Sequence, residues 1–120
     1  MIKPEFSLFL DVITAFYNKA TFDVMIGYHF RGIEDFSTHL PRIASFWQLQ
    51  LTGKIDHKEQ LPFDLINVHR PLKIKSAEIN RWEILFEQTL KEFKLEVEFH
   101  DLWMDKVKLF KEKLKSGLAL

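Results

Sequence analysis

Two of the five histidines lie within apolar stretches of the sequence. His39 lies at the head of one expected helix, and His69 lies thirty residues later, at the end of another. Pro71 closes the second helix, and the apolar side chains of Leu72 and Ile74 follow it. A neutral imidazole held rigidly over apolar side chains suits the protein ligand of a planar iron cofactor. The alternative for His69 is a core histidine that donates to a backbone carbonyl one turn back.

The other three histidines have charged or turn-forming neighbours, and we expect all of them on the surface: His29, His57 and His100. Asp56 and Glu59 lie close to His57 in the sequence and could bind a metal ion with it, but this spacing is not diagnostic of any metal. The functional hypothesis therefore depends on the two histidines in apolar surroundings.

Three polar-tipped side chains occupy inward positions of different expected helices: Tyr17, His39 and Trp82. Each would carry an O–H or N–H group into an apolar interior. Such burial is costly unless the groups bond to one another or to a ligand. Their pattern therefore indicates one polar corner in an otherwise apolar pocket.

Hydrophobic periodicity predicts an all-α fold with four substantial helices and short linking helices. The main apolar stripes cover residues 5–19, 40–51, 76–93 and 95–114. Segment 21–33 lacks this period and is expected to be a turn that carries Phe30. A short helix over 62–69, which includes Leu65, is expected before Pro71.

The expected helix ends follow from capping residues. Gly53 is the expected C-cap of the second main helix, and Ser76 is the expected N-cap of the longest helix. Residues 95–99 alternate like a strand, but a lone strand would have no partner. We therefore predict one continuous or kinked helix over 95–114.

The composition excludes several classes of function. A chain of 120 residues is expected to form one domain over 1–120. Seventeen basic residues balance seventeen acidic ones, which argues against nucleic acid and anionic membranes as partners. Because there is no cysteine, disulfides, thiolate zinc sites, iron–sulfur clusters and thiol nucleophiles are excluded.

The sequence also lacks the common catalytic and targeting motifs. None of its four glycines belongs to a G-x-G-x-x-G or P-loop pattern, and neither G-x-S-x-G nor H-E-x-x-H occurs. Neither a signal peptide nor a membrane-spanning run is visible, so we expect a cytoplasmic protein. Twelve phenylalanines raise the aromatic share to 14%, which indicates either an aromatic-rich helical core or a pocket for a flat apolar ligand.

Many of these residues form one ordered set with defined spacings. The set comprises Phe16-Tyr17-x-Lys19, Phe30, His39-x-x-Arg42-Ile43-x-x-Phe46-Trp47, Leu51-x-Gly53, His69-x-x-Leu72-x-Ile74 and Arg81-Trp82-x-x-Leu85-Phe86. It resembles the truncated haemoglobins, specifically the third group of that family, from about Phe9 to Leu90. As in that group, the paired-glycine motifs of the other truncated globins are missing.

The resemblance implies a two-over-two helical sandwich around haem b (iron protoporphyrin IX). It implies that His69 is the proximal iron ligand and that Tyr17, His39 and Trp82 take the distal positions near a bound ligand. Phe30 would pack on the porphyrin. The residues expected to contact the cofactor are Phe30, Arg42, Phe46, Trp47, Leu65, Leu72, Ile74 and Phe86.

Two positions near the expected distal site leave alternatives open. Arg42 matches a family position that reaches a haem propionate, but it could equally lie on a solvated helix face. Pro41 is comfortable only in the first turn of a helix, so this helix is expected to start around 37–40. His39 would then lie in the least secured turn and swing as a gate.

The implied function is binding of oxygen or another diatomic ligand, with nitric oxide or peroxide chemistry also open. Each donor aimed at the ligand contributes roughly 1.5–3 kcal/mol, so two or three donors predict slow release. A peroxidase-like or nitric oxide dioxygenase activity would need an external reductase as partner. The alternative is a haem-free helical module that binds a partner protein or an apolar small molecule. The expected assembly is a monomer or weak dimer.

Overall fold

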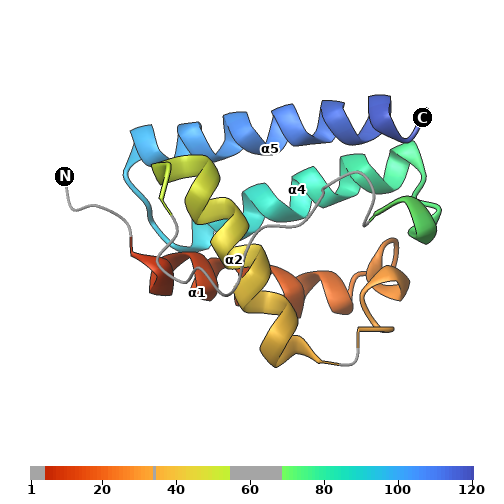
Figure 1. Cartoon of the computed structure of the whole chain (residues 1–120), viewed down its shortest axis with the longest axis horizontal. Helices are drawn as coiled ribbons and strands as arrows, with labels where there is room; N and C mark the ends of the chain where they lie inside the picture. Colours follow the sequence, from red (N-terminus) through yellow and green to blue (C-terminus); the bar gives the residue numbers. More distant parts are fainter. Residues whose placement is uncertain (1–4, 34, 55–68) are drawn as a thin grey trace.

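The computed structural model describes residues 5–33, 35–54 and 69–120, and the chain is helical throughout these ranges apart from its turns (Figure 1). The elements are α1 (Phe6–Thr21), the 3-10 helix η1 (Gly27–His29), α2 (Phe36–Thr52), the 3-10 helix η3 (Arg70–Leu72), α4 (Ser76–Glu92) and α5 (Val97–Gly117). The predicted all-α fold with four substantial helices and short linking helices is therefore confirmed. The helix expected over 62–69, with Leu65, lies outside the described residues except for His69.

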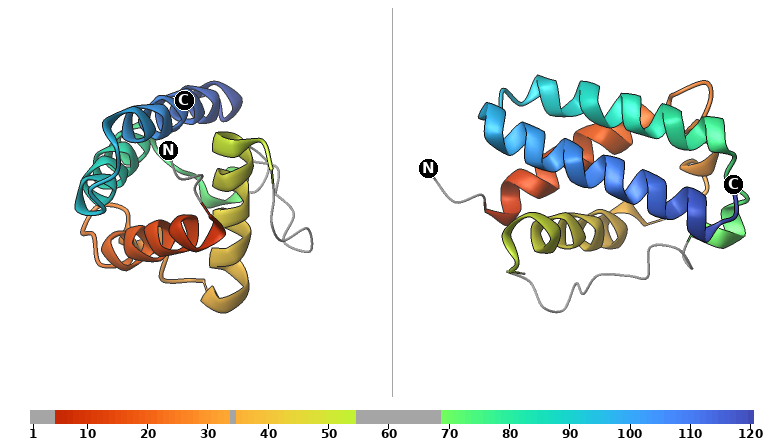
Figure 2. Two further views of the ribbon diagram at one scale, coloured as in Figure 1. Left: turned by 90° about the vertical axis from the view of Figure 1, so that its left-hand side faces the viewer. Right: turned by 90° about the horizontal axis from the view of Figure 1, so that it is seen from above.

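The four main helices pack as two neighbouring pairs. α1 packs mainly on α2, and α4 packs on α5. α1 also contacts α4 and thereby joins the two pairs, while α2 touches α5. Figures 1 and 2 show α4 and α5 running side by side in opposite directions, with α2 crossing α1 steeply. The tight turn between α4 and α5 places Lys94 at φ 51°.

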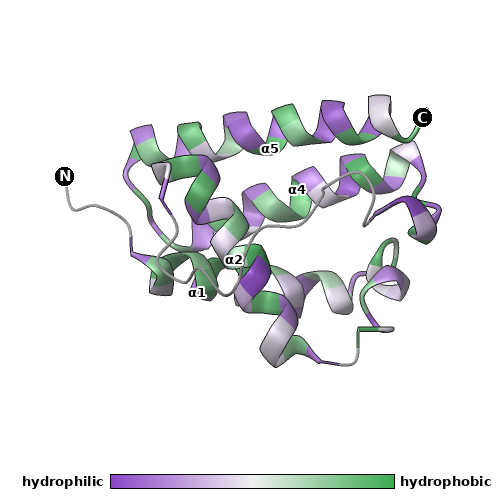
Figure 3. Cartoon of the chain, viewed as in Figure 1, coloured by the Kyte–Doolittle hydropathy of each residue, from purple (hydrophilic) through white to green (hydrophobic). Residues whose placement is uncertain are grey.

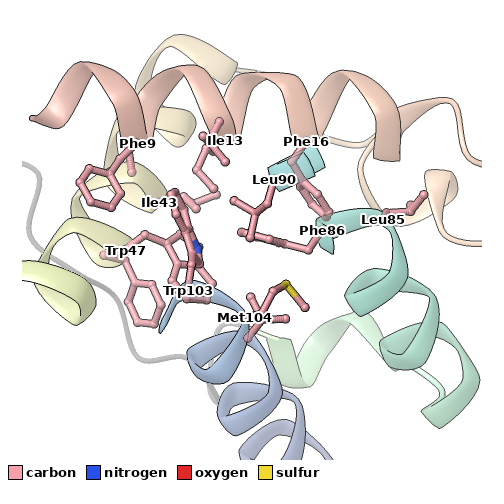
Figure 4. Packing of buried hydrophobic residues seen from close by; sticks show 14 of the residues in the cluster. Phe9, Ile13, Phe16, Ile43, Trp47, Leu85, Phe86, Leu90, Trp103 and Met104 are labelled. Carbon is pink, nitrogen blue, oxygen red and sulfur yellow. The ribbon is translucent and has the colours of Figure 1, made fainter. Parts of the chain in front are cut away.

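The buried side chains form one cluster that draws on all four main helices. Its centre is Trp103, which is fully buried in α5 (Figure 4). The Trp103 ring lies 5.2 Å from Phe9, 5.9 Å from Phe86 and 6.0 Å from Trp47, measured between ring centroids. Large rings at helical spacing therefore produce a core that fixes the relative positions of the helices.

The ends of α2 agree only in part with the prediction. Gly53 is its C-cap with φ 76°, which confirms the glycine cap, since this left-handed conformation suits glycine. The start predicted around 37–40 is wrong, because the Asp35 side chain accepts from the Thr38 N–H and starts the helix at Phe36. Pro41 consequently lies inside the helix, beyond its first turn.

The start of α4 also differs from the prediction. Ser76 is its first helical residue and does not cap it. The Glu78 carboxylate caps the helix by accepting the Lys75 N–H at 2.8 Å. α4 is not the longest helix either, since α5 has 21 residues and α4 has 17. The predicted helix over 95–114 is confirmed from Val97 onward.

The outer faces of the helices are largely polar and the inner faces apolar (Figure 3). Over the described residues, no helix combines the length and the apolar character that crossing a bilayer requires.

We predict that Trp103→Ala lowers the free energy of unfolding by about 3–5 kcal/mol, because it removes the ring at the centre of the core. Denaturant unfolding followed by circular dichroism measures this loss. Leu109→Ala is the matched control on the same helix, because Leu109 is 43% exposed and should cost less than about 1 kcal/mol. Equal losses in the two variants would contradict the central place of Trp103.

Candidate functional site

A cavity of about 330 Å³ lies among α1, η1, α2, the segment 69–74, α4 and the end of α5. Its volume falls within the usual range of small-molecule sites. The four polar residues singled out from the sequence all line it: Tyr17, His39, His69 and Trp82. The described residues expected to contact a cofactor line it as well, namely Phe30, Arg42, Phe46, Trp47, Leu72, Ile74 and Phe86. The structure therefore gathers at one cavity residues that are up to 69 positions apart in the sequence.

A hydrogen bond at the cavity joins Tyr17 of α1 to His39 of α2. The Tyr17 hydroxyl lies 3.2 Å from His39 Nε2. The Tyr17 ring packs edge-to-face on Phe30, with 5.1 Å between the centroids, and on Phe36 at 6.0 Å. Aromatic contacts on several sides fix the phenol where the sequence pattern predicted an inward position.

Both members of this pair stay uncharged near neutral pH. Burial raises the pKa of the Tyr17 hydroxyl well above its usual value of about 10. Burial lowers the pKa of His39, and the nearby charges of Arg42 and His69 lower it further. A neutral phenol carries one O–H and a neutral imidazole carries one N–H. Only one of these two donors is used in the bond between them, so the pair keeps the other. This donor suits a polar ligand in the cavity.

His69 immediately precedes η3 and is partly buried where it lines the cavity. His69 and His39 line the same cavity, and the charge of His69 is the smallest of the causes that lower the pKa of His39. The alternative in which His69 donates to a backbone carbonyl one turn back concerns residues outside the described part of the chain. Whether His39 swings as a gate stays a prediction, although the structure bonds it to Tyr17.

Aromatic side chains form much of the cavity wall. Trp82 packs edge-to-face on Phe86 with centroids 5.6 Å apart, and Phe86 is almost fully buried. Phe46 and Trp47 reach the cavity on one side and pack on the core residue Phe110 on the other. These residues therefore connect the site directly to the core.

Two of the expected contact residues lie at the rim. Arg42 is exposed and yet lines the cavity, and Leu72 is 42% exposed. Two alternatives were expected for Arg42: a contact with a haem propionate and a place on a solvated helix face. Its position at the rim is compatible with both.

A polar cluster that was not predicted from the sequence lies beside the cavity. The expectation that His29 lies on the surface is wrong, since its side chain is 10% exposed and lines the cavity. Its Nε2 lies 3.2 Å from Oε1 of Glu78, a buried cavity residue. The Tyr28 hydroxyl donates to the same carboxylate. No local pattern of the sequence indicated the contact between Glu78 and His29, because it spans 49 positions.

The remaining histidines do not join the cavity lining among the described residues. His100 is also more buried than expected, with a side chain 21% exposed and Nδ1 at 3.3 Å from Asp101. His57 lies outside the described residues. Across the described ranges, no three His, Asp or Glu side chains are grouped to hold a metal ion.

The donor set fits an iron porphyrin better than a bare metal ion. The imidazole of His69 reaches an apolar cavity with aromatic walls, which the uncharged Tyr17–His39 pair also lines, while His29 at the same cavity is bonded to Glu78. A porphyrin supplies four of its iron's ligands itself, so one imidazole suffices to attach it.

Comparison with known proteins gives no match: no family model, no curated protein and no solved structure is similar to the chain. The functional argument therefore depends on the cavity and on the residues that line it.

We predict that both tyrosines ionise at a higher pH in the folded protein than in the unfolded chain. Burial raises the pKa of Tyr17, and donation to Glu78 raises that of Tyr28. The folded chain then keeps protons that the unfolded chain releases, so the free energy of unfolding falls as the pH rises above about 10. Absorbance at 295 nm follows tyrosinate, and the same titration in guanidinium chloride is the control. Half-maximal tyrosinate absorbance of the folded protein at pH 10 would contradict these environments.

Proposed function

We propose that this chain is a haem protein with the two-over-two architecture of a truncated globin, which binds oxygen or another diatomic ligand. The observation that carries the proposal is the meeting of His69 with Tyr17, His39 and Trp82 at one apolar cavity. The pairing of α1 with α2 and of α4 with α5 supports the proposed architecture. The balanced charge and the absence of cysteine are compatible with a place in the cytoplasm.

His69 would be the residue that attaches haem b. Its imidazole comes from the segment 69–74, whose side chains Leu72 and Ile74 also line the cavity. Phe30 would pack against the flat face of the ring system, and Arg42 at the rim would pair with a propionate. When bound, haem supplies an iron atom that binds diatomic ligands and exchanges electrons.

Tyr17, His39 and Trp82 would hold the ligand by hydrogen bonds. Tyr17 keeps its proton because burial opposes ionisation, and it therefore acts as a donor or as the acceptor from His39. Trp82 can add its indole N–H, which is bonded to no other described residue. Donors fixed in an apolar site bind partial negative charge more strongly than in water. Slow release favours capture, sensing or redox chemistry with an external reductase over oxygen transport.

The attachment of haem is tested by His69→Ala. We expect this variant to lose stable haem retention, because its side chain offers no iron ligand. His100→Ala is the matched control, since His100 does not line the cavity, and it should keep the haem. Haem content per chain after gel filtration is the measurement, with circular dichroism to show that both variants fold. Full haem stoichiometry with an unchanged spectrum in His69→Ala would refute the assignment.

The donor role of the phenol is tested by Tyr17→Phe. Removing one hydrogen bond to a partly charged ligand should speed oxygen dissociation by about tenfold or more. Stopped-flow displacement of oxygen from the ferrous protein gives this rate. A rate equal to that of the native protein would mean that the Tyr17 hydroxyl does not touch the ligand.

A further inference from the structure

One wall of the cavity is formed where the segment 23–30 faces α4. His29 and Phe30 line the cavity from this segment, and Glu78, Ile79 and Trp82 line it from α4. η1 packs closely on α1, whereas its main contacts with α4 are made by polar side chains. Figure 1 shows η1 facing the beginning of α4 across this side of the molecule. Ile26 and Phe30 pack this segment against the core side, and the polar contacts join it to α4.

The first contact joins Asp23 to Arg81. Asp23 is 9% exposed, and its Oδ1 accepts from Arg81 Nε at 3.0 Å and from Nη2 at 2.8 Å. Its Oδ2 accepts from the backbone N–H groups of Met25 and Ile26 at 3.0 and 3.1 Å. One buried carboxylate thus shapes the turn after α1 and ties that turn to α4.

The second contact joins η1 to Glu78. This carboxylate is 5% exposed, and its Oε1 accepts the Lys75 N–H at 2.8 Å and lies 3.2 Å from His29 Nε2. Its Oε2 accepts from the hydroxyl of Tyr28, which is 53% exposed. A buried carboxylate that loses such partners is strongly destabilised, so this contact holds η1 in place.

We propose that these two contacts form a clasp, made of Asp23, Tyr28, His29, Glu78 and Arg81, that sets how fast a ligand of cavity size leaves. Glu78 and Arg81 are three positions apart and therefore lie on one face of α4. With both contacts closed, His29 and Phe30 stay in place as part of the cavity wall. The effect of the clasp on haem rests on the proposed function. In that case Asp23 and Glu78 are positioning residues that slow the loss of haem.

The bond between Tyr28 and Glu78 is poorly suited to transfer a proton. An ordinary phenol and an ordinary carboxyl differ in pKa by about six units. In this structure the pKa of Tyr28 is raised by its bond to Glu78, and the pKa of Glu78 is lowered by its donors despite its burial. Both shifts widen the gap, so the proton stays on Tyr28 and the bond acts as a fixed link.

Gly27 allows the segment to reach this closed position. A Cβ atom at Gly27 would lie 2.6 Å from the backbone oxygen of Thr21 and 3.1 Å from Arg31 Nη2. The first distance is shorter than real Cβ contacts, and backbone atoms cannot move aside without shifting the turn. Gly27→Ala should therefore displace η1 and loosen the clasp without changing any charge.

The test compares Glu78→Gln with Glu83→Gln. The amide in Glu78→Gln can still cap α4, but it loses the charge that holds Tyr28 and His29. Glu83 lies on the same helix, pairs with Lys111 at 2.8 Å and does not line the cavity. We expect haem transfer to an excess of a scavenging apoprotein to be at least tenfold faster for Glu78→Gln and for Asp23→Asn. Glu83→Gln should stay within twofold of the native rate. Equal rates for Glu78→Gln and Glu83→Gln would overturn the clasp.

A second readout separates the clasp from the proposed function. If the native chain takes up no haem, the proposed function fails, and the clasp is judged by amide hydrogen exchange of the haem-free protein. We expect at least tenfold faster exchange at the N–H groups of Gly27, His29 and Phe30 in Glu78→Gln and in Gly27→Ala. These N–H groups are bonded within the turn. Exchange in the middle of α5 should be unchanged. Native-like protection of the turn in both variants would overturn the clasp.

Discussion

The hydrogen bond between Tyr17 and His39 is the interaction on which the site depends. It joins α1 to α2 inside a mostly apolar cavity, where neither polar group can be fully solvated. Burial keeps both groups uncharged, and the surrounding rings, including Phe30, fix the phenol. Because the pair shares one proton and has another to offer, the cavity suits a small ligand that accepts a hydrogen bond.

One side of the cavity is packed rigidly against the core, and polar contacts help to close the other side. The aromatic cluster around Trp103 fixes the four helices, and Trp47 and Phe86 extend this rigid packing to the cavity wall. On the other side, buried carboxylates join the segment after α1 to α4. Polar contacts of this kind can open locally at less cost than the core, so this side is the natural route of exchange.

The helices were predicted from local periodicity, whereas most of the residues expected around a cofactor were implied by the resemblance to truncated haemoglobins. The inward positions of Tyr17 and Trp82 follow from the stripes of their own helices, and the structure places both at the cavity. The wrong predictions concern side chains whose contacts cannot be inferred from their neighbours in the sequence. His29 was expected on the surface from its sequence neighbours, which do not reveal that its partner Glu78 is 49 positions away. Ser76 was expected to cap α4, but the Glu78 side chain takes this role. Leu65 and the helix around it lie outside the described residues.

Titration of the haem-free native protein with haemin tests the central claim most directly. The account predicts a Soret band that grows to a sharp end point at one haem per chain, with a reduced spectrum typical of an imidazole-ligated iron. A chain that stays colourless with ample haemin would contradict it. The cavity would then belong to a helical module for apolar small molecules or a partner protein.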